Sequence, residues 1–166
     1  MRKSFCSDYL CAISKEPDAV AFISGSPKYH RIKGRVMFYS MYDGVIVCSE
    51  IKGLPTLLNG CKNSVFAFHI HSGNSCSGNE TDPFADVNGH YNPQDTPHPC
   101  HAGDMPPLFG ADGKAFSAFF TKRFYISEII GKTVIIHAMP DDFTTQPSGN
   151  AGEKMACGEI IAVKNR

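Results

Sequence analysis

The sequence has no excess of basic charge. Its 166 residues carry 16 Lys and Arg against 16 Asp and Glu, which gives a formal net charge of +0 with neutral histidines and a pI near 7.0. Surfaces that bind nucleic acid or anionic membranes need an excess of basic side chains. The charge balance therefore argues against a nucleic-acid partner and against a membrane partner.

Long apolar runs are also missing. Mean hydropathy is −0.18, and no stretch approaches the roughly 18 apolar residues that span a bilayer. The N-terminus starts with basic residues, but residues 10–13 are too short for the apolar segment of a signal peptide, and the charged stretch 14–18 ends it. We expect a cytoplasmic protein, or a secreted or periplasmic one if a leader has been removed.

The cysteines indicate neither a fully oxidised framework nor a thiolate zinc site. There are seven, an odd number, so at least one is unpaired in a monomer, and no two are spaced as CxxC. One structural disulfide remains compatible with this count. The cysteines are Cys6, Cys11, Cys48, Cys61, Cys76, Cys100 and Cys157.

Helical periodicity is scarce, and residues 125–130 hold at most one turn. Short runs rich in β-branched and aromatic residues instead alternate with Gly, Pro, Asn and Asp, which is typical of strands joined by turns. The predicted strands are 19–24, 35–39 (within a longer strand 31–40), 44–51, 64–72, 115–121, 133–138 and 158–163.

Two long segments, 73–107 and 139–156, lack strand character. Loops longer than about 15 residues without regular structure are usually functional or disordered. Regularly spaced strands with two such loops predict an antiparallel all-β sandwich or barrel. No repeat or linker divides the chain, and its length favours one domain.

The first of these loops is acidic. Residues 1–71 carry 9 basic and 5 acidic side chains, whereas residues 72–166 carry 7 and 11. No Lys or Arg occurs from Ser72 to Asp104, where the acidic residues are Glu80, Asp82, Asp86, Asp95 and Asp104. An acidic segment that also holds histidines favours a cation over a nucleic acid as its ligand.

Six of the seven histidines fall within residues 69–137. His69 and His71 alternate with apolar residues, so on a strand both imidazoles point to one face and can chelate a metal. Taken alone, this pair fits two packed or exposed histidines better. His137 ends a predicted strand shortly before Asp141, and a nearby carboxylate often fixes the tautomer of a ligating histidine.

The first long loop adds four further candidate ligands, which are His90, His98, His101 and Asp104. The last three lie in one tight loop shaped by Pro and Gly, and nitrogen and oxygen ligands at this spacing suit a tetrahedral ion such as zinc. Taken alone, the loop fits a polar surface segment equally well. Together with the strand histidines it predicts a metal centre, since four imidazoles suit copper and histidine with carboxylate suits zinc.

Five motifs in this order resemble the copper/zinc superoxide dismutases. The resemblance covers about residues 19–163, and His-Ala-Gly-Asp-Met-Pro at 101–106 is more similar to the bacterial branch of the family than to the animal one. The motifs are Phe68-His69-Ile70-His71, Gly89-His90-Tyr91-Asn92-Pro93, His101-Ala102-Gly103-Asp104, Ile136-His137 and Gly149-Asn150-Ala151-Gly152 with Ala156-Cys157-Gly158.

The resemblance implies an eight-stranded Greek-key β-barrel, an immunoglobulin-like sandwich with two long functional loops. The barrel domain would cover residues 19–166 and follow an N-terminal extension, residues 1–18. The implied activity is that of an oxidoreductase that converts superoxide to dioxygen and hydrogen peroxide, using copper and zinc, by cycling between Cu(II) and Cu(I). Monomer and homodimer both stay open.

The resemblance also assigns the metal ligands residue by residue. The implied copper ligands are His69, His71, His90 and His137. The implied zinc ligands are His90, His98, His101 and Asp104. His90 would bridge the two metals and take up a proton when copper releases it. Asp141 would link His69 to His98, and Cys76 would form a disulfide with Cys157.

One position departs from the family pattern. The family has an arginine three residues before the second disulfide cysteine, and this chain has Lys154. Lysine keeps the positive charge but loses the planar guanidinium with its several donors. We expect Lys154 and His90 to act as catalytic residues, and we expect the dismutase activity of the protein to be reduced by the replacement of arginine with lysine. The alternatives are a non-catalytic copper/zinc-binding protein of the same fold and a zinc-only structural domain.

The remaining cysteines and His30 are expected to have ordinary roles. Cys100 lies between two candidate zinc ligands, and an ordinary loop residue is favoured over a soft ligand or a redox-sensitive thiol. Cys6 and Cys11 lie in a segment before the barrel, where a tail without a metal function is favoured over a copper relay or a disulfide between the two. Cys48 on a strand is expected to be a small core residue, and His30 a solvated hairpin residue.

Overall fold

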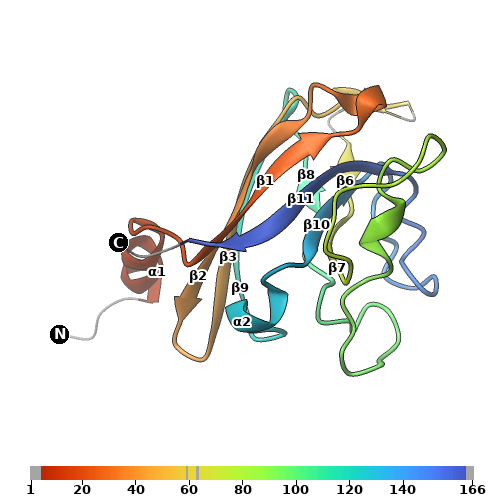
Figure 1. Cartoon of the computed structure of the whole chain (residues 1–166). Helices are drawn as coiled ribbons and strands as arrows, with labels where there is room; N and C mark the ends of the chain where they lie inside the picture. The colour runs from red at the N-terminus through yellow and green to blue at the C-terminus, as the bar shows by residue number, and fades with distance from the viewer. Residues whose placement is uncertain (1–4, 59, 63, 164–166) are drawn as a thin grey trace.

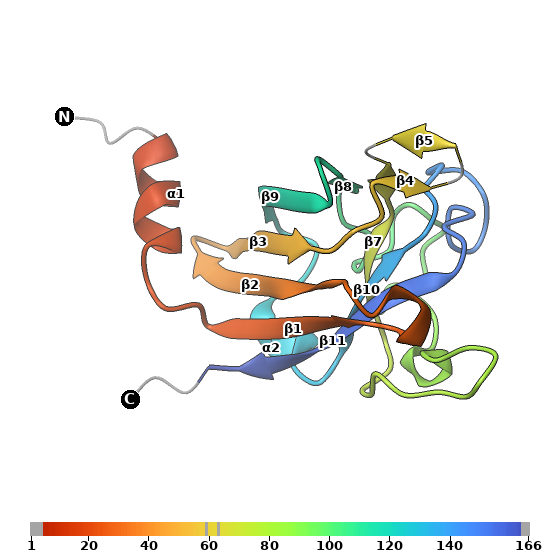
Figure 2. The same cartoon turned by 90° about the horizontal axis from the view of Figure 1, so that it is seen from above.

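The computed structural model describes residues 5–58, 60–62 and 64–163, and one curled antiparallel sheet dominates it (Figures 1 and 2). The helices are α1 (Phe5–Ile13) and α2 (Ile126–Ile129), with the 3-10 helices η1 (Pro27–Tyr29) and η2 (Ala85–Val87). The strands are β1 (Ala19–Gly25), β2 (Lys33–Met41), β3 (Gly44–Lys52), β4 (Leu57–Leu58), β5 (Cys61–Lys62), β6 (Val65–Phe66), β7 (Phe68–His71), β8 (Leu108–Phe109), β9 (Lys114–Thr121), β10 (Thr133–His137) and β11 (Lys154–Ala162).

Seven strands form one sheet in the order β7-β10-β11-β1-β2-β3-β9. Strand β8 joins its two edges, because β8 pairs with β6, which leads into β7, and also contacts β9. Strand β3 lies between β2 and β9 in the sheet, although β4 to β8 separate β3 from β9 in the chain, and this crossing makes the topology a Greek key. With β6 and β7 counted as one interrupted strand, the fold is the expected eight-stranded all-β barrel.

Five of the predicted strands occur within two residues of their expected bounds, as β1, β2, β3, β9 and β10. The predicted strand 64–72 is interrupted at Ala67, because β6 pairs with β8 whereas β7 pairs with β10. The predicted start of the last strand is wrong, since β11 begins at Lys154 and the second long loop ends at residue 153. Met155, Ala156 and Cys157 are all buried, so this part of β11 lacks the alternation that marks a strand.

Helix α1 is a further correction, because the sequence indicates almost no helix. Tyr9, Ala12 and Ile13 pack against the outer face of the sheet, and the Tyr9 ring meets the Phe120 ring edge-on at 6.2 Å between centroids. The cluster beneath them includes Cys48, which is buried as expected. The apolar spacing of this helix covers a single turn, which is too short to indicate a helix reliably.

Helix α1 lies at one end of the barrel, and the two long loops lie at the other (Figure 2). The interior between these ends is filled by large apolar side chains such as Phe38, Phe66 and Phe68. A disulfide between Cys76 and Cys157 ties the first long loop to β11, as the resemblance implies. The first long loop is therefore fixed to the strand that pairs with β10, which ends at the predicted ligand His137.

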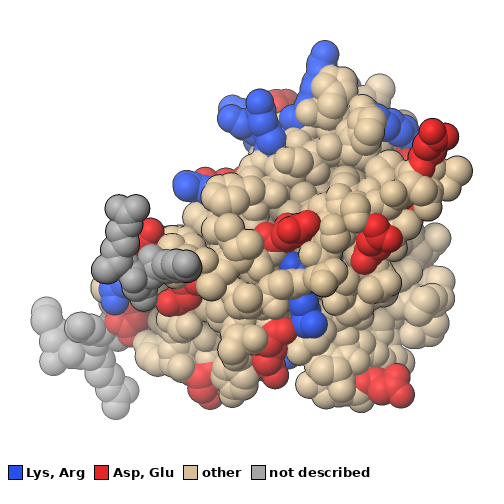
Figure 3. All heavy atoms as spheres, viewed as in Figure 1, with Lys and Arg blue, Asp and Glu red and all other residues tan. Residues whose placement is uncertain are grey.

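The charges are spread unevenly over the surface. Lys and Arg side chains gather along the upper edge of the face in Figure 3, and Asp and Glu side chains lie mostly below them.

None of the helices in the described part of the chain combines the length and the hydropathy needed to cross a bilayer.

Candidate metal centre

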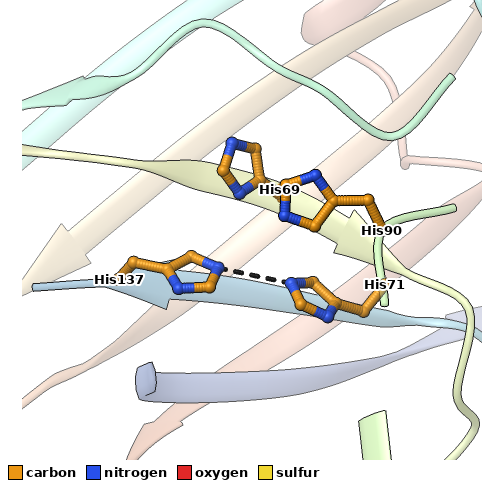
Figure 4. Close-up of side chains that lie close together, drawn as sticks. All are labelled: His69, His71, His90 and His137. Atoms are coloured by element: carbon orange, nitrogen blue, oxygen red, sulfur yellow. Dashed lines mark hydrogen bonds between the residues drawn. The ribbon is translucent and has the colours of Figure 1, made fainter. Parts of the chain in front are cut away.

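Two adjacent strands and one loop bring four of the predicted histidines together. His69 and His71 lie on β7, and His137 ends β10, which pairs with β7. His90 comes from the first long loop and forms a backbone bridge with His71. The side chains of these four residues lie close together (Figure 4). We call them the four-histidine group.

The four-histidine group has the geometry of a metal site. One nitrogen from each ring lies within 4.8 Å of the other three, and His71 Nε2 is 3.3 Å from His137 Nε2. Two of the ring nitrogens, His69 Nδ1 and His90 Nε2, are buried and have no hydrogen-bond partner in the part of the chain that the structure describes. Buried polar atoms without partners are rare in proteins, so these two call for a ligand.

Protein acceptors hold the opposite nitrogen of three of these rings. His71 Nδ1 donates to the carbonyl of Asn88 at 2.7 Å, and His137 Nδ1 to that of Gly152 at 3.3 Å. His69 Nε2 donates to Asp141 Oδ2 at 2.7 Å. Because the N–H of each ring is used in this way, the other nitrogen keeps its lone pair for a metal.

The loop ligands form a second group, which we call the mixed group and which consists of His90, His98, His101 and Asp104. Asp104 lies at its centre, with Oδ1 2.7 Å from His90 Nδ1 and Oδ2 3.0 Å from His98 Nδ1. His101 Nδ1 is 3.3 Å from His90 Nδ1. The ring of His90 therefore belongs to both groups, through Nδ1 here and through Nε2 in the four-histidine group.

Asp141 connects the two groups as predicted. Its carboxylate is buried and accepts from His69 Nε2 through Oδ2, and from His98 Nε2 through Oδ1 at 2.8 Å. The backbone N–H of Phe143 donates to Oδ1 at 2.7 Å. Burial opposes ionisation, but these three donors outweigh it and hold the pKa of Asp141 below its ordinary value. Gly149 makes room for this contact, since a Cβ there would lie 2.0 Å from Oδ1.

Four of the candidate ligands have pKa values that are shifted toward the protonation states that metals bind. Burial lowers the pKa of His71 to about 3 and lowers the pKa values of His69 and His137. Burial raises the pKa of Asp104. The hydrogen bond with His90 and the charges of the neighbouring imidazoles lower it by a larger amount, so the net shift is downward. Neutral imidazoles and ionised carboxylates are the ligating forms.

Lys154, the remaining predicted site residue, lies at the start of β11 opposite His137 in the sheet register. Its ammonium forms an ion pair with the carboxylate of Asp82, a contact that the sequence did not indicate. Cys100 and Cys11 are exposed and belong to neither group, and His30 is exposed. The side chain of Cys6 lies outside the described part of the chain.

Other supporting residues were missed in the sequence. Arg123 Nη1 donates to the carbonyls of Pro99, His101 and Asp104 at 2.9, 3.1 and 3.3 Å. Gln146 holds His98 through both its backbone groups, donating to the carbonyl at 2.7 Å and accepting from the N–H at 3.0 Å. These contacts join loops distant in sequence, so no local pattern predicts them.

A model of the copper/zinc superoxide dismutase family matches residues 32–160, a range that contains every residue of both groups. This chain belongs to the copper/zinc superoxide dismutase family. The donor atoms agree with this, since four imidazoles suit copper and three imidazoles with one carboxylate suit zinc.

Three bacterial relatives illustrate the match, which agrees with the predicted bacterial-type branch of the copper/zinc superoxide dismutases. The Cu-Zn superoxide dismutase 2 of Aquifex aeolicus is 31% identical over 142 residues, covering 76% of this chain and 78% of the relative. The Cu-Zn superoxide dismutase of Deinococcus radiodurans is 30% identical over 151 residues, covering 80% and 79%. That of Legionella pneumophila is 31% identical over 157 residues, covering 90% and 89%.

The metal-free protein should lose stability as the pH falls below about 6.5, the ordinary histidine pKa. In this range the unfolded chain takes up protons that the buried His69, His71 and His137 do not, because their folded pKa values are lowered. Each group then decreases the free energy of unfolding by about 1.4 kcal/mol per pH unit until its folded pKa is reached. Urea unfolding at pH 7 and pH 5 measures this. Equal free energies at the two pH values would contradict it.

Proposed function

We propose that this protein is a superoxide dismutase, which converts superoxide to dioxygen and hydrogen peroxide. The observation that carries the proposal is the position of His90, whose ring belongs to both ligand groups. Binding alone does not need one imidazole shared between two metals. A shared imidazole instead supplies a nitrogen that holds either a metal or a proton, as a redox enzyme that releases a protonated product requires.

We assign copper to the four-histidine group and zinc to the mixed group. Copper supplies the one-electron redox change that disproportionation of superoxide requires, whereas zinc has no accessible second oxidation state. Asp104 contributes the carboxylate that favours zinc in the mixed group. Asp141 holds one ring of each group, so the two groups keep a fixed relative position.

In this assignment His90 and Lys154 act on the substrate. His90 Nε2 is buried and has no hydrogen-bond partner among the described residues, so it is the nitrogen that accepts a proton and donates it to the peroxide product. Lys154 lies opposite His137 in the sheet register, next to the four-histidine group. Lys154 therefore provides positive charge near the four-histidine group, where it attracts and orients the superoxide anion.

A non-catalytic copper/zinc-binding protein is the second candidate, and one observation favours it. The carboxylate of Asp82 neutralises Lys154, which weakens the attraction for an anion. A zinc-only structural protein would leave the four-histidine group without a purpose.

We further propose the domain boundaries and the compartment. Residues 19–166 form the dismutase domain, and residues 1–18 form an N-terminal extension whose helix α1 packs on the barrel. The disulfide between Cys76 and Cys157 supports the secreted or periplasmic location over the cytoplasm, since thiols are kept reduced in the cytoplasm.

Protein reconstituted with copper and zinc should dismutate superoxide rapidly, and His137→Ala should lose nearly all of this activity. The variant removes one ligand of the four-histidine group and leaves the mixed group complete. Pulsed generation of superoxide with optical detection measures the rate, and the exposed variant His30→Ala is the control. Stoichiometric binding of both metals without turnover above that of His137→Ala would favour the metal-binding candidate.

Lys154→Arg should raise the turnover of the reconstituted enzyme by about two- to tenfold. A guanidinium has enough donors to keep the ion pair with Asp82 and still present N–H groups to the anion, whereas the ammonium offers a single charged nitrogen. Steady-state rates of the two proteins at equal metal content provide the comparison. A rate in the Arg variant no higher than in the wild type would show that lysine is not the limiting feature.

A further inference from the structure

The cation proposed to attract the substrate is already paired. Lys154 Nζ contacts Asp82 Oδ2 in an ion pair, and the lysine side chain is only 20% exposed, compared with 41% for the aspartate. Asp82 belongs to the first long loop and lies 72 positions away in the sequence. The contact therefore depends on the folded arrangement of loop and strand.

Asp82 is fixed by its own turn. Its Oδ1 accepts from the backbone N–H of Phe84 at 3.0 Å, and its backbone N–H donates to Asn79 Oδ1 at 2.9 Å. Its carbonyl accepts from the N–H groups of Asn79 and Ala85 at 2.9 and 3.1 Å. The carboxylate is thus held in place with Oδ2 directed at Lys154, and the flexible lysine side chain adapts to it.

The described side chains that line the hollow beside Lys154 include no unpaired cation. This hollow of about 500 Å³ is lined by five charged side chains, which are Lys28, Glu80, Asp82, Glu153 and Lys154. The carboxylate of Glu153 accepts from Lys28 Nζ and from the Tyr29 hydroxyl. Both cations that line the hollow are therefore paired, and three carboxylates face two ammonium groups.

We propose that Asp82 is a positioning residue of this dismutase, which restrains Lys154 on the side of the first long loop and neutralises its charge. An anion that approaches the four-histidine group then meets less positive charge than it would if Lys154 were unpaired. The proposal rests on the proposed function for its consequence, since it concerns the attraction of superoxide. The ion pair itself does not depend on the activity.

The test compares Asp82→Asn with the matched control Glu80→Gln. Asparagine keeps an oxygen to accept the Phe84 N–H, so the turn is retained while the charge is removed. Glu80 is exposed and lines the same hollow, so its variant removes the same unit of charge from the same loop without breaking the ion pair. Asp82→Glu restores the carboxylate and should return every readout toward the wild type.

The first readout is the rate at which acetic anhydride acetylates Lys154 in the metal-free protein, located by peptide mass spectrometry. We expect Asp82→Asn to react several-fold faster and Glu80→Gln to match the wild type. The second readout is azide binding to the copper- and zinc-loaded protein, followed by absorption. We expect about threefold tighter binding in Asp82→Asn at low salt, a similar rise in kcat/KM for superoxide, and a steeper decline of both with ionic strength.

Equal acetylation of Lys154 in Asp82→Asn and Glu80→Gln would overturn the proposal, whatever the turnover. Faster acetylation of Lys154 in Asp82→Asn, with an azide affinity no higher than in Glu80→Gln, would overturn the claim that Asp82 weakens the attraction between Lys154 and the anion. A wild-type protein that fails to dismutate superoxide would instead contradict the proposed function. Acetylation and azide binding would still decide the role of Asp82 in that case.

Discussion

The buried carboxylate of Asp141 is the contact on which both ligand groups depend. It accepts N–H donors from His69 of the four-histidine group and from His98 of the mixed group. A buried charge is tolerated only when it is well hydrogen-bonded, and the backbone N–H of Phe143 provides a third donor. The conformation around Gly149 leaves the space for the carboxylate. The second long loop therefore sets the relative orientation of rings that come from β7 and from the first long loop.

The strands and the loops position the side chains of the site by different means. The ladder between β7 and β10 holds His69 and His71 in register, and His137 follows at an irregularity where β10 pairs with β11. The long loops have almost no ladder of their own, and side-chain contacts replace it: the disulfide at Cys76, the Arg123 donor to three loop carbonyls and the Gln146 bonds to His98. These contacts tie the first long loop to the barrel and to the second long loop, and they position the candidate ligands of the loop without a strand ladder.

Sequence reasoning succeeded where the signal was local. Short runs of β-branched and aromatic residues between turn residues predicted most strands of the sheet, and the His69–His71 spacing predicted two rings on one face. The reasoning failed at Met155 and its neighbours at the start of β11, which are neither β-branched nor aromatic and do not alternate with polar residues. It also failed in α1, where one turn of helix carried the only signal. No pattern in the sequence indicates the ion pair between Lys154 and Asp82, since a contact between residues 72 positions apart depends on how the loop folds. The acceptors of His71 and His137 are backbone carbonyls, which no residue type marks.

The metal content of His90→Ala tests most directly whether one imidazole serves both ligand groups. After loading with copper and zinc and dialysis against a weak chelator, the wild type should retain both metals. His90→Ala should lose both, because each group is left with three donors, whereas His101→Ala should lose chiefly zinc. Elemental analysis of the three proteins gives the answer. Retention of either metal by His90→Ala at the wild-type level would show that the two groups do not share this ligand.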